Sequence, residues 1–413
     1  MPAVIIYSSG TEGRPKAAMI SHHNIISAIR QGDSRIKLVE GKRYMDFLPP
    51  AHGFGYMMRR SIEGLGATIY PSHRDTLADD LPAVSPHIIT GVPKFFMAIA
   101  ERIRNRVAAA GMDIENLQEF QKHLILRAAG LGDVELVVSG AAALPDETVL
   151  FFRDCLGLRI DQAYGVTETS PGVTINTADE WKLGTVGKPF TGVSVSIVDE
   201  KLNPLPAGTE GEIAVAGDNV FMGYFKDEER TKKVLREIDG VRWYLTGDIG
   251  MLDDEGFLTI TDRKDDMLVP TSGENVSSAS VENKLAFHSR YIGYAVPYGT
   301  RRDYVIAVVW TDETKHENII ADARNAGIES DNVAEIIADE RFKEMLEQDL
   351  RNALEVGGFN SHERPRGFVF LANPTDEEET GTLKARKKGV RKKFKVELDK
   401  LYSTGQFLKF VQQ

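Results

Sequence analysis

Three short polar segments carry residue types that suit nucleotide binding. The first is the loop at residues 8–16, with the sequence SSGTEGRPK. Its glycines allow tight turns that bring backbone N–H groups close to an anion, while its hydroxyls and Lys16 add donors and positive charge. This composition suits a polyphosphate site, and it suits a polar surface turn equally well. The loop is not a Walker A sequence, because Gly-Lys-Ser/Thr does not follow at the required spacing.

The second segment, residues 161–169 (DQAYGVTET), places an aromatic ring, a glycine, a hydroxyl and a carboxylate close together. Tyr164 could stack on a flat base, and Thr167 could donate to a phosphate. Glu168 could hold Mg²⁺, which prefers oxygen ligands. The third segment, YLTGD, ends at Asp248, whose carboxylate could accept from ribose hydroxyls or could be an ordinary hairpin-turn aspartate.

The elements around these segments indicate an α/β protein. Up to about residue 180, short apolar runs such as ATIY and HIIT alternate with helical patterns such as residues 93–111, which predicts a parallel or mixed sheet. After residue 180, short strands separated by glycine and Asp-Gly turns predict an antiparallel β module. From residue 263 we expect a third region with helices at about 315–326 and 332–357 and a basic C-terminal helix over 383–402.

Composition narrows the function classes. The 413 residues carry a net charge of −11, which argues against a protein that coats nucleic acid. A single cysteine, Cys155, excludes an internal disulfide and fits a reducing compartment, so we expect a cytoplasmic protein. The sequence contains neither an apolar run of about 18 residues nor a signal-peptide pattern, so we expect no transmembrane segment; peripheral membrane contact stays open.

The order of these motifs along the chain is more specific evidence than any single motif. The segments SSGTEGRPK, SGAAALP, YGVTE, TGD, DRKDD and TGTLK follow one another along essentially the whole chain. This series resembles the signature of the adenylate-forming (AMP-binding) ligases, which include acyl-CoA synthetases, luciferases and the adenylation domains of peptide synthetases. Two further segments, LPPAHGFGYMM and PHIITGVPKFF, are similar to long-chain acyl-CoA synthetases, whereas residues 239–263 are similar to bacterial acyl-carrier-protein synthetases.

The resemblance implies roles for individual residues toward ATP and Mg²⁺. It implies that the ATP phosphates are held by Ser8, Ser9, Gly10, Thr11, Gly13 and Lys16. It implies that the nucleoside and the α-phosphate are contacted by Gly140, Ala141, Tyr164, Gly165, Thr167, Asp248 and Arg263. Glu168 would be the magnesium ligand, and Asp265 would lie at the hinge between the large and small domains.

The resemblance also implies the catalytic set Lys384, Thr11, Glu168 and His52. Attack of a carboxylate on the α-phosphorus accumulates negative charge that an ammonium group at Lys384 would stabilise. Without the resemblance, Lys384 would be taken as part of a solvated basic helix. His52 would lie at the gate of the acyl pocket, with a core histidine as the alternative. Gly273 would lie beside the pantetheine arm of CoA.

The implied architecture is a shortened core with the phosphate loop and acyl pocket (1–180), a small β module of the large domain (181–262) and a mobile α+β C-terminal domain (263–413). The core is expected to be shortened because family members usually carry a further subdomain before the phosphate loop. The implied reaction converts a fatty acid, long-chain by the segments above, into acyl-AMP and then acyl-CoA. The alternatives are a ligase for acyl carrier protein, an adenylation-only enzyme and a non-catalytic nucleotide-binding relic.

The sequence departs from the family pattern at four positions. Glu12 stands where the phosphate loop usually has Thr or Ser. Asp262 stands where most members have Gly, Ser272 replaces a common Gly, and Ser278 replaces a common Pro. The last three lie near the expected hinge and the thiol-transfer loop, so they concern the second half-reaction more than adenylation.

Overall fold

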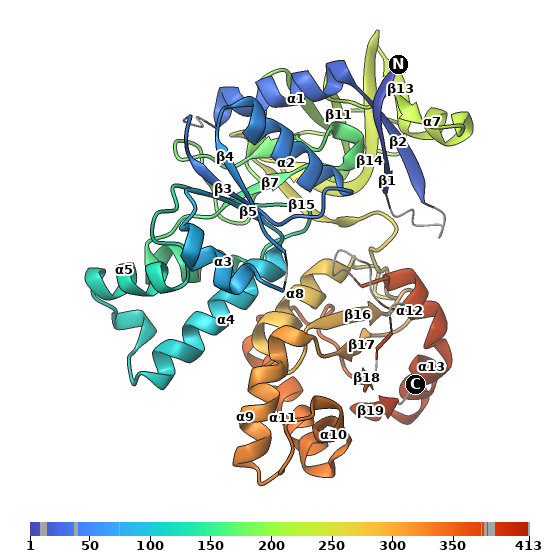
Figure 1. Cartoon of the computed structure of the whole chain (residues 1–413). Helices are drawn as coiled ribbons and strands as arrows, with labels where there is room; N and C mark the ends of the chain where they lie inside the picture. Colours follow the sequence, from blue (N-terminus) through green and yellow to red (C-terminus); the bar gives the residue numbers. More distant parts are fainter. Residues whose placement is uncertain are drawn as a thin grey trace. The chain divides into compact units, whose positions relative to one another are not determined.

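The structure, a computed structural model, describes residues 1–8, 15–36, 40–73, 75–372, 374–375, 378 and 385–411, without the side chains of Ser8, Asp33 and Ser34. The chain divides into two compact units, Met1–Ile260 (unit 1) and Thr261–Gln413 (unit 2), coloured blue to yellow and gold to red in Figure 1. The regions 1–180 and 181–260 therefore belong to one unit. The structural boundary falls two residues before the expected start of the C-terminal domain.

A seven-stranded sheet forms the α/β part of unit 1, in the order β4-β3-β5-β6-β7-β8-β9. The first five strands in this order are parallel, and β8 and β9 are antiparallel. The strands are β3 (Arg43–Asp46), β4 (Thr68–Pro71), β5 (Ile88–Gly91), β6 (Leu136–Ser139), β7 (Asp161–Tyr164), β8 (Thr174–Ile175) and β9 (Lys188–Pro189). The accompanying helices are α1 (His22–Arg35), α2 (Gly53–Gly64), α3 (Leu77–Val84), α4 (Pro93–Ala109), α5 (Glu119–Ala128) and α6 (Asp146–Leu150).

Both faces of this sheet are buried, which explains why its strands read as continuous apolar runs. Successive side chains of a strand point to opposite faces. Accordingly, Ile88 of β5 packs in a small cluster with residues of α2, while its neighbour Ile89 packs with residues of α3, α4 and the segment 149–156. Likewise, Val137 of β6 faces this second cluster, and Val138 faces the β-rich part of unit 1.

The β-rich part of unit 1 contains two antiparallel sheets. The larger has the order β10-β11-β14-β13 with β15 also paired to β14, from the strands β10 (Val193–Val198), β11 (Gly211–Gly217), β13 (Leu235–Ile238), β14 (Val241–Leu252) and β15 (Leu258–Arg263). The smaller joins the N-terminal hairpin of β1 (Pro2–Ser8) and β2 (Lys16–Ser21) to β12 (Gly223–Tyr224), which precedes α7 (Glu228–Val234). This smaller sheet brings the start of the chain beside a segment some 200 residues later.

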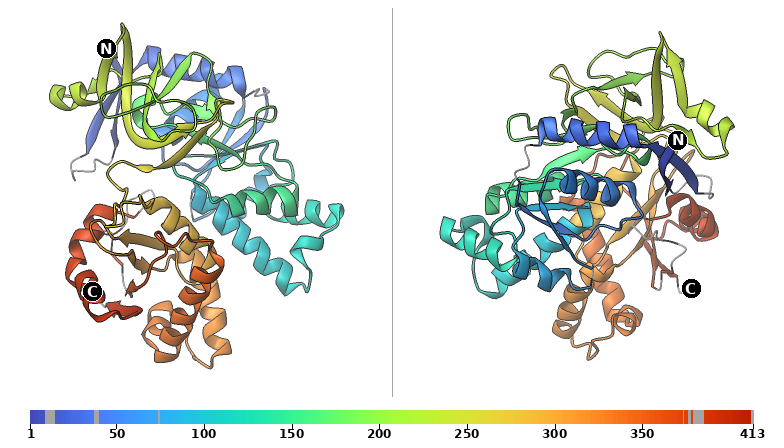
Figure 2. Two further views of the ribbon diagram at one scale, coloured as in Figure 1. Left: turned by 180° about the vertical axis from the view of Figure 1, so that it is seen from behind. Right: turned by 45° about the horizontal axis from the view of Figure 1, so that its top comes forward.

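Unit 2 is a four-stranded sheet with helices on both faces, as Figures 1 and 2 show. Its strands are β16 (Tyr294–Tyr298), β17 (Ile306–Trp310), β18 (Phe368–Leu371) and β19 (Leu408–Val411). One face packs against α8 (Ser278–His288), α9 (His316–Asn325), α10 (Val333–Ala338) and α11 (Glu340–Val356). The other face packs against α12 (Lys387–Lys393) and α13 (Lys395–Thr404).

Two helices expected from the sequence are each divided in the structure. The stretch 332–357 breaks at Asp339, which adopts an extended conformation and caps α11 by accepting from the backbone N–H of Arg341 at 2.8 Å. The basic stretch 383–402 breaks at Phe394, which packs into the core between α12 and α13. In the part of the chain that the structure describes, no helix is both long and apolar enough to cross a membrane.

Candidate active site

The predicted phosphate loop joins two paired strands. Ser8 ends β1 and pairs with Lys16, the first residue of β2. The loop residues Ser9, Gly10, Thr11 and Gly13 lie outside the described residues. The Lys16 ammonium lies 5.9 Å from the ring centroid of Tyr224, a cation–π contact that supports the base of the loop from β12.

The YGVTE segment follows the end of β7 and turns sharply. Gly165 is required there because a Cβ atom at this position would lie 1.5 Å from the carbonyl oxygen of Pro171. The turn continues into a short 3₁₀ helix (Thr167–Thr169), where the Thr169 hydroxyl accepts from the N–H of Val166 and donates to its carbonyl. This local hydrogen bonding places Thr167 and Glu168 directly beyond the sheet edge.

A side-chain amide fixes the far end of the same turn. The fully buried Asn219 donates from Nδ2 to the carbonyls of Thr169 and Gly172, at 3.1 and 2.6 Å. The backbone N–H of Phe221 donates to the carbonyl of Glu168 at 2.8 Å. The segment that leads into β12 therefore holds the YGVTE turn through several bonds, which sequence reasoning did not anticipate.

The TGD motif is a bulge in β14. Opposite β11, the register moves from Leu245 paired with Ala214 to Ile249 paired with Glu212, so Ile213 faces three residues of β14. The bulge is stabilised by the Thr246 hydroxyl, which donates to the Ile213 carbonyl, and by Gly247 with a φ of +73°. Bulges re-aim side chains next to functional sites, and this one turns Asp248 inward. Asp248 is 4% exposed.

The structure brings Tyr164, Glu168 and Asp248 into one buried group together with two further tyrosines. The Tyr164 hydroxyl donates to Asp248 Oδ2 at 2.6 Å, and the Tyr224 hydroxyl donates to Glu168 Oε1 at 2.8 Å. Tyr244 lies among them, close enough to both carboxylates that they raise its pKa. We call these five residues the tyrosine–carboxylate cluster.

Burial strengthens the preference of the phenols in this cluster for their protonated form, which is already the ordinary form at neutral pH. It raises the pKa of Tyr224 far above its ordinary value, and the negative charge of Glu168 adds to the effect. Burial is also the main cause that raises the pKa of Tyr244. Both phenols therefore stay protonated at neutral pH and can donate hydrogen bonds to carboxylates.

Sequence reasoning missed Tyr224 and gave no role to Tyr244. The available signal was weak: Tyr224 is a tyrosine in the otherwise apolar run VFMGYF, where a buried phenol needs a hydrogen-bond partner. The partner, Glu168, is 56 residues away in the sequence. Only the packing of β12 against β2 and the YGVTE turn shows the pairing.

A narrow cavity of about 30 Å³ adjoins the cluster, with room for about one water molecule. Four predicted residues are among those that line it, and the lining consists of Phe54, Gly140, Ala141, Ala163, Tyr164, Gly165 and Pro171. Ala141 has a φ of +69°, a strained conformation for a residue with a side chain and one that is frequent at functional sites.

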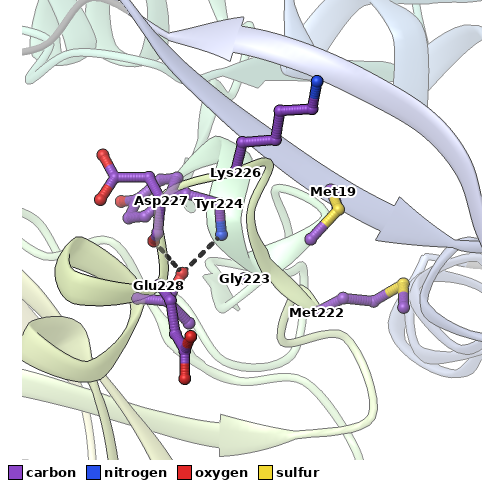
Figure 3. A pocket seen from close by; sticks show the side chains of 8 residues that line it. Met19, Met222, Gly223, Tyr224, Lys226, Asp227 and Glu228 are labelled. Atoms are coloured by element: carbon purple, nitrogen blue, oxygen red, sulfur yellow. Dashed lines mark hydrogen bonds between the residues drawn. The ribbon is translucent and has the colours of Figure 1, made fainter.

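A wider, open hollow of about 450 Å³ lies beside β12, where Met19, Met222 and Lys226 are among the lining residues (Figure 3). Tyr224 lines it too, but none of the predicted site residues is among its described lining residues. Its shape is held by the Thr231 hydroxyl, which accepts from the N–H of Tyr224 and donates to the Asp227 carbonyl. Four of the predicted site residues therefore lie at the narrow cavity, and none of the described lining residues of the larger hollow is a predicted site residue.

His52 lies at the N-terminal end of α2. The next residue, Gly53, contacts the YGVTE turn: a Cβ atom built there would lie 3.2 Å from Oγ1 of Thr167. The structure thus brings the start of α2 beside Thr167, two segments more than 100 residues apart. The role of His52 as a gate stays a prediction.

The remaining predicted residues belong to unit 2. Arg263 ends β15, and Gly273 lies in an exposed loop with a φ of +79°. Lys384 lies outside the described residues.

Two of the departures from the family pattern, Asp262 and Ser278, prove to be partners. Asp262 Oδ2 accepts from the backbone N–H groups of Ser278 and Ala279, the first residues of α8. A carboxylate at the N-terminus of a helix satisfies N–H groups that have no partner within the helix.

Glu168 has a carboxylate that is suited to bind Mg²⁺ as a ligand. It is 6% exposed, and among the described residues it forms no ion pair with a lysine, arginine or histidine. A buried carboxylate without a cation is costly, and one hydroxyl donor offsets only part of this cost. Mg²⁺ prefers oxygen ligands, so the Glu168 carboxylate fits this ion.

Known proteins match this chain in sequence over nearly its whole length. Residues 1–225 match the AMP-binding enzyme family. The chain is 30% identical to long-chain-fatty-acid–CoA ligase 1 of Cavia porcellus over 97% of its own length and 61% of the relative's. It is 29% identical to the long-chain-fatty-acid–CoA ligase FadD15 of Mycobacterium bovis, over 97% and 69%. The chain thus spans about three fifths to two thirds of the length of these relatives.

Solved structures share the fold. ATP-bound MatB from Rhodopseudomonas palustris aligns with a TM-score of 0.67 at 25% identity, over 95% of this chain and 68% of the other. The adenylation domain of a carboxylate reductase from Mycobacterium chelonae aligns with a TM-score of 0.77 at 22% identity, over 97% and 60%. With a family match that covers more than half of its residues, the chain belongs to the AMP-binding enzymes, the adenylate-forming family that its ordered motifs resemble.

Proposed function

We propose that the chain activates a long-chain fatty acid with ATP and transfers the acyl group to CoA. The observation that carries the proposal is the tyrosine–carboxylate cluster at the cavity lined by Gly140, Ala141 and Tyr164. It combines an aromatic ring with carboxylates suited to a ribose and to a metal ion. The choice of a long-chain acid and of CoA rests on the names of the relatives and on the segment around His52.

In the first half-reaction, a carboxylate oxygen of the acid attacks the α-phosphorus of ATP. The new oxygen–phosphorus bond forms as the bond from the α-phosphorus to the bridging oxygen breaks, and pyrophosphate leaves. The ring of Tyr164 would orient the adenine, Asp248 and Arg263 the ribose, and Thr167 the α-phosphate. The loop at residues 8–16 would hold the β- and γ-phosphates, and Lys384 would stabilise the charge that develops.

Mg²⁺, when bound at Glu168, would neutralise phosphate charge. In the second half-reaction, the CoA thiol loses its proton and attacks the acyl carbonyl carbon, and AMP leaves as the carbon–oxygen bond breaks. Gly273 would lie beside the thiol arm. A cytoplasmic location is part of this proposal.

The decisive experiment measures acid-dependent pyrophosphate release with ATP and Mg²⁺, across acids from acetate to palmitate, with and without CoA. We expect release with long acids and acyl-CoA formation when CoA is present. Release without acyl-CoA would favour an adenylation-only enzyme or transfer to an acyl carrier protein, which can then replace CoA in the assay. No release from folded protein with any acid would overturn the proposal in favour of a nucleotide-binding relic.

A paired substitution tests the lysine. Lys384→Ala should lower the rate of pyrophosphate release about 10²- to 10³-fold, because a charge-stabilising donor acts mainly in the transition state. ATP binding measured by calorimetry should change little. Lys388→Ala, four residues later and exposed, is the matched control and should keep the wild-type rate. Equal rates for the two variants would remove Lys384 from the reaction.

A further inference from the structure

Tyr224 contacts two separate parts of the proposed ATP site. Its hydroxyl donates to Glu168 Oε1 at 2.8 Å, and the ammonium of Lys16 lies 5.9 Å from the centre of its ring. Lys16 begins the strand that follows the phosphate loop, and Glu168 is the last residue of the YGVTE segment. One side chain thus joins the base of the phosphate loop to the carboxylate suited to Mg²⁺.

The surroundings hold this tyrosine firmly. Tyr224 is 3% exposed, and its ring packs at 4.9 Å from the ring of Phe221, which also contacts Tyr244. The backbone N–H of Tyr224 donates to the Thr231 hydroxyl at 2.8 Å. Gly223 adopts a φ of +135° beside Thr231, so the backbone reaches this position through a conformation that favours glycine. A phenol fixed at both ends can act as a rigid support.

Such a support matters because Glu168 can rotate about several bonds. A metal-binding carboxylate needs a hydrogen-bond donor on one oxygen to orient the other, and loss of such a donor typically lowers metal affinity 10- to 100-fold. Among the described residues, Tyr224 is the one whose hydroxyl bonds to the Glu168 side chain.

We propose that Tyr224 is a positioning residue that orients Glu168 toward Mg²⁺ and couples this carboxylate to the phosphate loop through Lys16. The inference rests on the proposed function, in which Glu168 holds the metal that accompanies ATP. Tyr224 does not itself touch the reacting atoms. Its hydroxyl acts through Glu168 and its ring through Lys16, and the two actions can be separated by substitution.

The test measures ATP binding by calorimetry as the Mg²⁺ concentration is varied, with the full chain and no acid substrate. Tyr224→Phe keeps the ring and removes the hydroxyl, so it should raise the Mg²⁺ concentration for half-maximal binding about tenfold. ATP binding in EDTA should change less than twofold. Tyr224→Leu removes the ring as well, so it should give the same Mg²⁺ shift and also weaken binding in EDTA.

A matched control comes from unit 2, where the Tyr291 hydroxyl donates to Asp322 Oδ2 at 3.0 Å. Tyr291→Phe removes the same kind of bond and should leave the Mg²⁺ dependence unchanged. Thermal unfolding verifies that each variant is folded, and either Tyr224 variant alone suffices for the test. In a Glu168→Gln background, Tyr224→Phe should add less than a twofold shift, because its effect passes through Glu168.

The outcomes separate this inference from the proposed function. If Glu168→Gln shifts the Mg²⁺ dependence but the Tyr224 variants behave like Tyr291→Phe, the positioning role is overturned and the metal site stands. A Tyr224→Phe shift of equal size in the Glu168→Gln background would also overturn it. If wild-type protein binds ATP with no dependence on Mg²⁺, or if Glu168→Gln changes nothing, the metal site itself is wrong and the inference is overturned with it.

Discussion

Two clusters, one in each unit, hold their carboxylates in different ways. In unit 1, the tyrosine–carboxylate cluster holds Glu168 by a phenol hydroxyl. In unit 2, the ion-pair cluster of Asp262, Asp266, Glu282, Lys387 and Arg391 surrounds its carboxylates with cations. Lys387 Nζ lies 3.0 Å from Glu282 Oε2, and Arg391 lies 3.8 Å from Asp266 Oδ1.

The difference separates carboxylates that are paired with cations of the chain from Glu168, which we propose binds Mg²⁺. Burial alone would lower the pKa of Lys387, but Glu282, Asp262 and Asp266 outweigh it and raise this pKa, so the ion pair stays charged. Arg391 also donates to the Ser278 hydroxyl and to the Pro297 carbonyl, which ties α12 to two other elements. Glu168 has no comparable cation among the described residues, which supports the proposal that it binds Mg²⁺.

The largest effect on stability should come from breaking the ion-pair cluster. Lys387→Met should lower the free energy of unfolding by about 3 kcal/mol, because it leaves Glu282 in a mostly buried site without its cation. Denaturant unfolding measures this loss. Lys388→Met, at an exposed neighbouring position, should change the free energy by less than about 0.5 kcal/mol. Similar values for the two variants would mean that the cluster is not structural.

In the tyrosine–carboxylate cluster, we expect a substitution to change the free energy of unfolding in the opposite direction. Glu168→Gln should raise the free energy of unfolding by about 1 kcal/mol without ligand, because it removes a buried charge that has no cation and keeps an acceptor for Tyr224. The same variant should lose the thermal protection that wild-type protein gains from ATP with Mg²⁺.

The matched control for this variant is Glu180→Gln. Glu180 pairs with Arg35 at 2.5 Å and with Lys188 at 3.0 Å, so its neutralisation should not stabilise the protein. A stability gain in Glu180→Gln as large as in Glu168→Gln would show that any lost negative charge stabilises this acidic chain, and the comparison between the units would fail.

The smallest expected effects are changes in protein stability with pH. Burial and the neighbouring Glu147 raise the pKa of Asp146 in unit 1, although a backbone N–H from Gly184 opposes them. Burial also opposes ionisation of Glu378 in unit 2, but the bonds from Lys393 and Thr375 outweigh it and hold the pKa of Glu378 below its usual 4.5. One group is thus easier to protonate in the folded state than in the unfolded state, and the other is harder.

The two shifts predict opposite pH dependences. The contribution of Glu378 is present above pH 4.5 and is lost as the pH falls through its lower folded pKa. The contribution of Asp146 is fully present below pH 3.8 and is lost as the pH rises through its higher folded pKa. Glu378→Gln should therefore cost more stability at pH 7 than at pH 4, whereas Asp146→Asn should cost less at pH 7. Denaturant unfolding at both pH values checks this, and equal differences for the two variants would contradict it.

Much of the fold could be predicted because local sequence patterns indicate its strands and turns. The apolar runs around Ile88 and Val137 gave the parallel strands, and the glycine-rich turns after residue 180 gave the antiparallel strands. The break at Asp339 was missed although it is local, because Asp339 caps α11 through the N–H two residues later. The break at Phe394 depends on the packing of its ring into the core, which local patterns do not show.

The residues of the site also divide into those that the sequence identifies and those that only the structure identifies. Tyr164, Glu168 and Asp248 could be selected from the sequence because each belongs to a motif, and the structure brings them together. Tyr224 could not be selected, because its partner Glu168 is distant in the sequence and no motif marks the pair. The partnership of Asp262 with the N-terminus of α8 was likewise hidden, although Asp262 and Ser278 had each stood out as unusual.

Gly165 has a consequence for engineering. Any side chain larger than a hydrogen atom would collide with the Pro171 carbonyl, whatever the enzyme binds or converts. In a library randomised over residues 161–169 and sorted only for expression of folded protein, glycine should be retained at residue 165 while residue 167 varies. The pattern of recovered residues would then separate what the polypeptide needs in order to fold from what selection for catalysis imposes.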